Sequence, residues 1–160
     1  VHQSCVPNPE NRNSAIEVTL QVGPDNVRND VTSTDEGDYT IPACLAMLVH
    51  LVKEPCFDDL RTKQQLGYLV FSGALTSGDD SILSLRFIVQ SEEKDPVYLD
   101  GRVEAFLQCF RSEYLEKLSE DEFQVNVIAV TEKLMEKDIV MKFIYLLAMF
   151  QSTKRNLYLI

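Results

Sequence analysis

Residues 68–90, with the sequence YLVFSGALTSGDDSILSLRFIVQ, contain two apolar runs that flank a polar turn. Short apolar runs bounded by Gly, Ser and Asp are typical of β-strands joined by a turn. We therefore predict strands over residues 68–71 and 82–90 with a turn at 76–80, and this antiparallel hairpin decides the fold class. One face of the second strand is apolar and is expected to be buried; its residues are Leu83, Leu85, Phe87 and Val89.

A third strand and a long helix are predicted before the hairpin. In residues 14–23 apolar and polar side chains alternate, which is the period of a half-buried strand. Residues 39–52 are dense in apolar side chains and predict a largely buried helix, with Pro42 in its first turn, where a missing N–H costs nothing. We expect Pro55 to end this helix, because the residue before a proline avoids the α region.

A second, short helix is predicted between the long helix and the hairpin, over residues 56–66. Gly67 is expected to stop it. The residues expected in the core are Cys56, Phe57, Leu60 and Leu66, and those expected in solvent are Lys63, Gln64 and Gln65.

Two further helices are predicted after the hairpin. Asp95 and Pro96 open the first, as a cap and a first helical residue, and this helix is expected to end near Leu118. Ser119 and Glu122 have the spacing of a capping box and open the second. The apolar stripes of the two helices contain Val103, Phe106, Leu107, Phe110 and Tyr114, and Phe123, Val127, Val130 and Leu134.

The predicted order of elements is β-α-α-β-β-α-α, followed by an apolar tail. A mostly antiparallel sheet with helices packed on one side is the α+β solution for such an order. We predict one domain over residues 1–138 and a divergent hydrophobic tail over residues 139–160. The apolar run at 139–150 is shorter than the roughly 18 residues of a membrane span, so no membrane span is predicted.

The composition is that of an ordinary globular protein and limits the partners. The 160 residues carry 15 Lys and Arg against 25 Asp and Glu, a formal charge of -10, and such a surface repels phosphate backbones, which argues against nucleic-acid binding. We expect no signal peptide, because the N-terminal residues VHQS have no basic start and no apolar stretch behind them. The first residue is not Met, and we expect an excised piece of a longer protein. Separate buried thiols in a reducing, cytoplasmic compartment are expected of the cysteines, which are Cys5, Cys44, Cys56 and Cys109.

No catalytic or metal site is predicted in the chain. Its histidines are His2 and His50, and the H-x-x-x-E formed by His50 and Glu54 lacks the further ligands that a helical zinc site needs. The sequence has neither a G-x-S-x-G elbow nor a glycine pattern that cradles phosphate. The residues alone therefore predict a domain without a detectable active site.

A resemblance to a peptidase family is carried by residues 54–73, EPCFDDLRTKQQLGYLVFSG. This stretch closely resembles the insulin-degrading-enzyme family of insulysin, nardilysin and pitrilysin peptidases, and the similarity continues through residues 85–91 and 102–107. The resemblance implies a clamshell of four homologous α+β domains around a chamber, with an H-x-x-E-H zinc motif in the first domain. The matched segment resembles the start of the fourth, non-catalytic domain.

The resemblance also implies a role for Arg61 and Tyr68. They match the family's Arg and Tyr that contact substrate near the scissile bond when the halves close. A guanidinium and a phenol hydroxyl are donors suited to a peptide carbonyl or to the oxyanion of a tetrahedral intermediate. Gly67 is expected to permit the sharp exit from helix to strand that aims Tyr68. The alternative is that Arg61 pairs with Asp58 or a neighbour, while Tyr68 merely begins a strand.

We therefore predict a non-catalytic, substrate-contacting segment of an insulysin-like zinc metalloendopeptidase, a hydrolase, and expect the chain to be inactive alone. Zinc is expected in the complete enzyme, bound by another domain and not by this chain. The expected partners are the N-terminal catalytic half and peptide substrates.

Two other hypotheses remain open. The first is a stand-alone peptide- or protein-binding domain that has lost peptidase activity, and the second is a fragment without function. Residues 139–160 do not resemble the family's continuation, so either a truncated copy or an altered reading of the gene would leave the domain incomplete.

Overall fold

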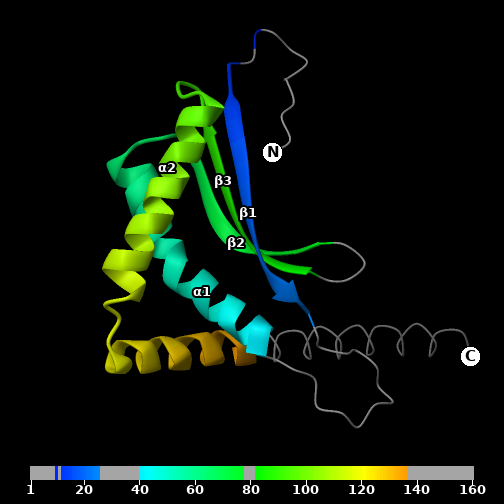
Figure 1. The fold of residues 1–160 in the computed structure, drawn as a ribbon, viewed down its shortest axis with the longest axis vertical. Helices are drawn as coiled ribbons and strands as arrows, with labels where there is room; N and C mark the ends of the chain where they lie inside the picture. Colours follow the sequence, from blue (N-terminus) through cyan, green and yellow to red (C-terminus); the bar gives the residue numbers. More distant parts are fainter. Residues whose placement is uncertain (1–9, 11, 26–39, 78–81, 137–160) are drawn as a thin grey trace, which may run out of the picture. The chain divides into compact units, whose positions relative to one another are not determined.

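The computed structural model describes residues 10, 12–25, 40–77 and 82–136. The chain divides into two compact units, Val1–Leu118 and Ser119–Ile160. The first unit contains a sheet and the helices that pack on it (Figure 1). The predicted division of the chain at residues 138 and 139 stays a prediction, because residues 137–160 lie outside the described residues.

Three antiparallel strands form the sheet, in the spatial order β1-β3-β2. Their bounds are β1 Ser14–Pro24, β2 Leu69–Ser77 and β3 Ile82–Ser91. The pairing of β2 with β3 runs from Leu69 opposite Gln90 to Ser77 opposite Ile82, so the predicted hairpin is confirmed. Part of the predicted turn at 76–80 belongs to β2, and the rest lies outside the described residues.

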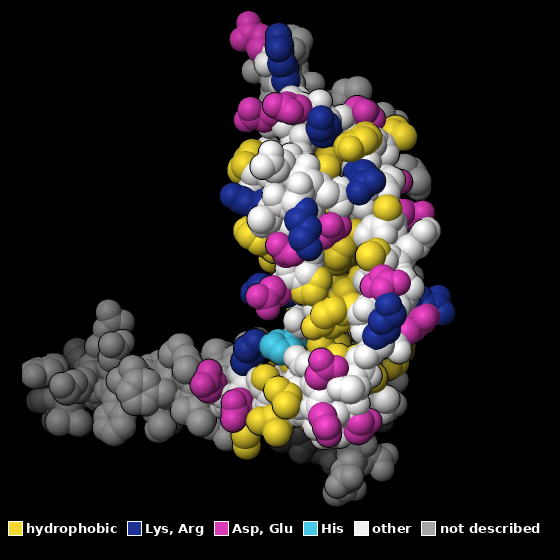
Figure 2. Space-filling model, turned by 90° about the vertical axis from the view of Figure 1, so that its left-hand side faces the viewer, with side chains coloured by type: hydrophobic (Ala, Val, Ile, Leu, Met, Phe, Trp, Pro, Cys, Tyr) yellow, Lys and Arg dark blue, Asp and Glu magenta, His cyan; other side chains and the backbone are white. Residues whose placement is uncertain are grey.

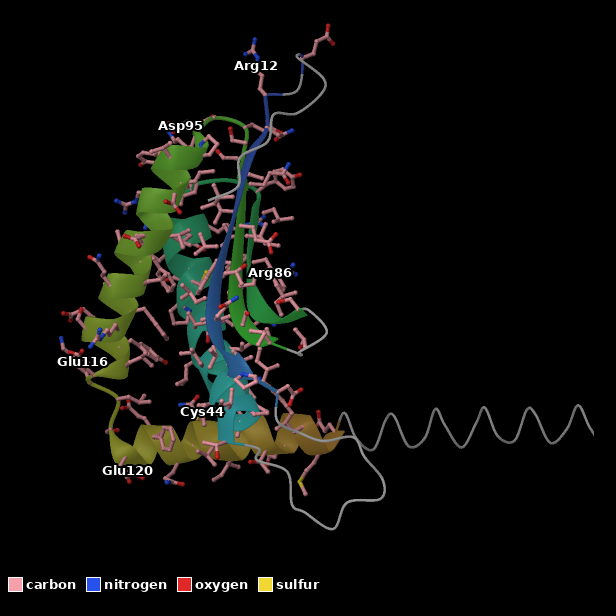
Figure 3. All side chains as sticks on the ribbon, turned by 45° about the vertical axis from the view of Figure 1, so that its right-hand side comes forward. Arg12, Cys44, Arg86, Asp95, Glu116 and Glu120 are labelled. Carbon is pink, nitrogen blue, oxygen red and sulfur yellow. The ribbon has the colours of Figure 1, made fainter. Side chains whose placement is uncertain are left out.

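The two faces of the sheet differ because side chains alternate along each strand. The face toward the helices includes the predicted apolar row of β3, whose four residues are buried: Leu83, Leu85, Phe87 and Val89. Arg86, labelled in Figure 3, lies on the opposite face. Its Nη1 lies 3.5 Å from Oε1 of Glu17. The guanidinium carbon of Arg86 lies 5.7 Å from the ring centroid of Phe71, which is exposed. The face away from the helices therefore carries both polar and apolar side chains and is partly open to solvent.

One continuous helix takes the place of the first two predicted helices. α1, Thr40–Cys56, continues into the π-helical segment η1, Phe57–Lys63. The prediction that Pro55 ends the helix is wrong, because Pro55 lies inside α1. A proline removes one backbone donor, but buried residues on both sides of it, Val52 and Leu60, hold the helix against the sheet.

A second helix lies on the same side of the sheet (Figure 1). α2, Pro96–Cys109, continues into the π-helical segment η2, Phe110–Leu115. Asp95 is its cap, as predicted: Oδ1 accepts hydrogen bonds from the backbone N–H groups of Val97 and Tyr98, each at 3.0 Å. Asp95 stands at the beginning of the helix in Figure 3.

The helices and the sheet share one hydrophobic core. The ring of Phe106 meets that of Phe87 edge to face, with centroids 6.3 Å apart, and stacks on Phe110 at 5.8 Å. The core residues of the helical segments are Leu45, Leu51, Val52, Cys56, Leu60, Leu99, Val103, Phe106 and Phe110. The predicted α+β class is confirmed, and the order of elements is corrected to β-α-β-β-α-α.

The second unit is helical over residues 120–136. The predicted capping box is confirmed: the N–H of Ser119 donates to the carboxylate of Glu122 at 3.0 Å, and the N–H of Glu122 donates to Oγ of Ser119 at 3.3 Å. Hydrogen bonds from the side chain and the backbone of Ser119 lower the pKa of Glu122.

Among the described residues, the helix Thr40–Lys63 is long and apolar enough to cross a membrane by length and composition. The core helix of a soluble protein meets the same criteria. Leu51, Val52 and Leu60 of this helix are buried in the core cluster, so we assign it to the core of the first unit.

Candidate functional site

The candidate site is the turn between η1 and β2, residues 64–68. Arg61 lies in the last turn of η1, and Tyr68 stands directly before β2. Between them the backbone of Gln65 has a φ of 50°, in the left-handed region that non-glycine residues seldom adopt. π-Helical turns such as η1 occur frequently at functional sites. The turn thus connects a helix end and a strand start that each carry one predicted site residue.

Backbone hydrogen bonds close the helix and fix the start of the turn. The N–H of Gln64 donates to the carbonyl of Asp59 at 3.0 Å, and the N–H of Leu66 donates to the carbonyl of Leu60 at 3.1 Å. Leu60 and Leu66 are both buried, which confirms their predicted place in the core. The turn is therefore held in place by the packing of Leu60 and Leu66 as well as by main-chain hydrogen bonds.

Gly67 is required by a close approach to β3. A Cβ atom at this position would lie 1.8 Å from the carbonyl oxygen of Gln90, far inside any tolerated contact. The prediction that Gly67 stops the helix is wrong, because η1 ends earlier, at Lys63. The glycine instead allows the turn to press against the neighbouring strand.

A hydrogen bond joins the two predicted site residues. Nη1 of Arg61 donates to the backbone carbonyl oxygen of Tyr68. The guanidinium carbon of Arg61 also lies 5.2 Å from the ring centroid of Phe57, a cation–π distance. Arg61 is exposed, and Tyr68 is 57% exposed. The guanidinium of Arg61 and the side chain of Tyr68 are thus both at the surface.

Two neighbours of Arg61 differ from expectation. The prediction that Phe57 lies in the core is wrong: its side chain is 47% exposed, and the neighbour on its ring is the guanidinium of Arg61. Asp58, the alternative partner of Arg61, forms an ion pair with Lys63, whose Nζ lies 2.7 Å from Oδ2. The hydrogen bond and the charge of Asp58 raise the pKa of Lys63.

Gln64 is a member of the site that the sequence analysis missed. It was expected in solvent, but it is half-buried between two charged side chains. Its Oε1 accepts a hydrogen bond from Nε of Arg102 at 2.6 Å, and its Nε2 donates to Oδ2 of Asp59 at 2.7 Å. Arg102 follows 38 residues later on another helix, so no local spacing could have revealed this contact.

Burial makes the thiol of Cys56 a poor nucleophile. Cys56 is buried as predicted, and burial raises the pKa of its thiol to about 11, which the Ser72 side chain offsets only in part. The expectation of buried thiols is wrong for Cys44 and Cys109, which are exposed because each faces away from the core on its helix. Cys5 lies outside the described residues.

The part of the chain that the structure describes does not fit a zinc site. Within it, no group of three or more His, Cys, Asp or Glu side chains could hold a metal ion. His50 and Glu54 lie on α1, and a zinc ion needs further protein ligands to complete its coordination.

Charges of both signs cover the side of the molecule shown in Figure 2. Acidic and basic side chains are interspersed there, on both sides of a band of hydrophobic side chains. The net charge of -10 therefore does not form a single acidic patch on this side.

A family model matches more than half of the chain. The model describes the C-terminal lobe domain 4 of PQQ synthase PqqF-like proteins, and it matches residues 47–142. This range contains the whole turn between η1 and β2.

Curated proteins and a solved structure resemble the same region. The insulin-degrading enzyme of Homo sapiens is 38% identical over 81% of this chain and 11% of its own length. The A-factor-processing enzyme of Saccharomyces cerevisiae is 32% identical over 85% and 12%. A Schizosaccharomyces pombe protein whose name describes a zinc protease is 34% identical over 86% and 13%. A crystal structure of pitrilysin superposes on 76% of this chain and 11% of its own, with a TM-score of 0.58 at 28% identity. The chain thus spans about a tenth of the length of such relatives.

Proposed function

Because this chain belongs to the insulysin–pitrilysin peptidase family, as a segment of the C-terminal lobe, we propose that it is a non-catalytic segment that contacts the peptide substrate of a zinc metalloendopeptidase. In this role the segment forms part of the wall of a closed chamber. Arg61 and Tyr68 are its contact residues.

The chemistry of these two residues suits a peptide bond. A guanidinium offers several N–H donors in a fixed plane, and a phenol offers one O–H donor. Such donors stabilise a carbonyl oxygen as negative charge develops on it, and they act most strongly where water is excluded. The segment would therefore bind and orient the substrate without supplying a nucleophile or a general base.

One observation carries this proposal: Arg61 Nη1 is bonded to the carbonyl oxygen of Tyr68, while both side chains remain exposed. An arginine with a purely structural role would be expected to donate its hydrogen bonds to buried acceptors. Here the cation is held in place by one main-chain acceptor and one aromatic face. The remaining N–H groups of the Arg61 guanidinium stay at the surface.

The chain spans about a tenth of the length of its relatives, so the rest of the enzyme would lie in other domains. Since the described residues do not fit a zinc site, zinc would be held by another domain of the complete enzyme. The partners are then the N-terminal catalytic half and the peptide substrate. The exposed free thiols of Cys44 and Cys109 are compatible with a reducing compartment, and we place the protein in the cytoplasm.

Kinetics in the complete enzyme that carries this segment test the proposal. We expect Tyr68→Phe and Arg61→Ala each to lower kcat/KM on a peptide substrate by about 10-fold or more, because each removes a donor to the reacting group. Tyr98→Phe is the matched control, since Tyr98 is similarly exposed but lies on α2. If kcat/KM stays unchanged in both site variants, the substrate contact does not exist.

A further inference from the structure

We propose that Arg102 and Gln64 are positioning residues, which fix the turn between η1 and β2 and so set where Arg61 and Tyr68 stand. The inference rests on the proposed function, because it assigns a role to residues that act through that pair. Neither Arg102 nor Gln64 is taken to touch the substrate.

The Gln64 side chain links a cation to an anion. Nε of Arg102 donates to Oε1 of Gln64 at 2.6 Å, and Nε2 of Gln64 donates to Oδ2 of Asp59 at 2.7 Å. An amide has one acceptor end and one donor end, so a guanidinium and a carboxylate on opposite sides determine its orientation. Both hydrogen bonds have a charged partner, which makes them stronger than bonds between neutral groups.

This chain of bonds acts at the centre of the site. Gln64 is the residue that follows η1, and its backbone N–H bonds to the carbonyl of Asp59 at 3.0 Å. The next residue, Gln65, has the uncommon φ of 50°. Such a conformation costs free energy and persists only where its surroundings enforce it. The bonded Gln64 side chain supplies that constraint on the helical side of the turn.

The other end of the chain of bonds is rigid. Arg102 lies on α2, next to Val103, which is fully buried in the core. A bond from α2 to Gln64 therefore ties the turn to a helix that packs on the sheet. Loss of this bond would remove the tie between the turn and α2 and leave the packing of Leu66 and the contact of Gly67 with β3. The donors of Arg61 and Tyr68 would then be less firmly positioned.

Two substitutions in the complete enzyme remove the link. We expect Gln64→Ala and Arg102→Ala each to lower kcat/KM by about 10-fold, because small displacements of positioned groups are costly. Gln64→Glu combined with Asp59→Asn is the conservative variant: the carboxylate at 64 still accepts from Arg102, and the amide at 59 supplies the donor at its other end, so we expect kcat/KM within about 3-fold of the parent. Arg111→Ala is the matched control, since Arg111 is an exposed arginine of η2 paired with Glu116.

A double-mutant cycle separates positioning from general stability. In the Arg61→Ala/Tyr68→Phe background, Gln64→Ala should cause no further loss, because the groups it positions are gone. A full additional loss in that background, or a loss in Gln64→Glu/Asp59→Asn as large as in Gln64→Ala, overturns the inference. The midpoint of thermal unfolding is measured for each variant. Arg102→Lys, which keeps the charge but not the Nε–H geometry, replaces Arg102→Ala if that variant does not fold, and unchanged kinetics in it also overturn the inference.

The outcomes distinguish this inference from the proposed function. If Arg61→Ala and Tyr68→Phe lower kcat/KM while Gln64→Ala and Arg102→Ala do not, the substrate contact stands and the positioning role falls. If Arg61→Ala and Tyr68→Phe leave kcat/KM unchanged, both the proposed function and the positioning role are wrong.

Discussion

The guanidinium of Arg61 donates a hydrogen bond to the main-chain carbonyl of Tyr68, seven residues further along the chain. Because the acceptor belongs to the backbone, the Tyr68 side chain is not needed for this bond. Tyr68→Phe therefore removes only a phenol hydroxyl, whereas Arg61→Ala removes a donor and also frees the backbone that carries Tyr68. We expect the Arg61 substitution to lower kcat/KM more than the Tyr68 substitution does, in steady-state kinetics of the complete enzyme.

The contact between Gly67 and β3 predicts a large effect of a single methyl group. Gly67→Ala would place Cβ 1.8 Å from the Gln90 carbonyl oxygen, so either the turn or the strand must move. We expect the free energy of unfolding of the purified chain to fall by about 3 kcal/mol or more in a urea titration.

Gly101→Ala is the control for that substitution. A Cβ at Gly101 meets no atom within 4 Å, and the residue lies inside α2. Alanine is the better helix former, so this variant should gain about 0.5 to 1 kcal/mol. Equal destabilisation by both substitutions would contradict the close approach at Gly67.

The cap of α2 predicts a smaller effect. Asp95→Ala removes the acceptor of two backbone N–H groups at the first turn, and we expect the free energy of unfolding to fall by about 1 kcal/mol. Asp100→Ala is the matched control, since Asp100 is an exposed aspartate within the same helix. Indistinguishable urea midpoints for the two variants would show that Asp95 does not act as the cap.

The buried thiol of Cys56 predicts a dependence of stability on pH. Burial raises the pKa of this thiol from 9.0 to about 11, so the unfolded state loses the proton at a lower pH than the folded state does. The contribution of Cys56 to stability is therefore present below pH 9 and is lost as the pH rises toward 11.

Urea titrations from pH 8 to 11 on the parent chain and on Cys56→Ala check this effect. We expect the difference in stability between the two proteins to shrink as the pH rises. A difference that stays constant over this range would show that the thiol titrates alike in both states.

Local patterns predicted most of the fold. Alternation of apolar residues identified β1 and β3, and the chemistry of Asp95 and of the pair Ser119 and Glu122 located two helix starts, because each of these signals acts over a few residues. Pro55 failed as a signal because packing of the helix on the sheet outweighs one missing hydrogen bond.

The candidate site was predictable only in part. The resemblance named Arg61 and Tyr68, but their hydrogen bond spans a turn that contains the left-handed backbone of Gln65, which no local pattern indicated. The role of Gly67 is set by Gln90, a residue of another strand. The contact of Gly67 with Gln90 joins residues far apart in sequence, and periodicity and spacing contain no information about it.

A photo-crosslinking experiment tests the contact between this segment and substrate most directly. A benzophenone amino acid would replace Tyr68 in the complete enzyme, and in a parallel control it would replace Tyr98. A chelator would remove the metal from each variant. Each variant would then be irradiated together with a labelled peptide substrate. We predict that the peptide is captured from position 68 and not from position 98. Equal capture from both positions, or none from position 68 while the enzyme still binds the peptide, would contradict the account.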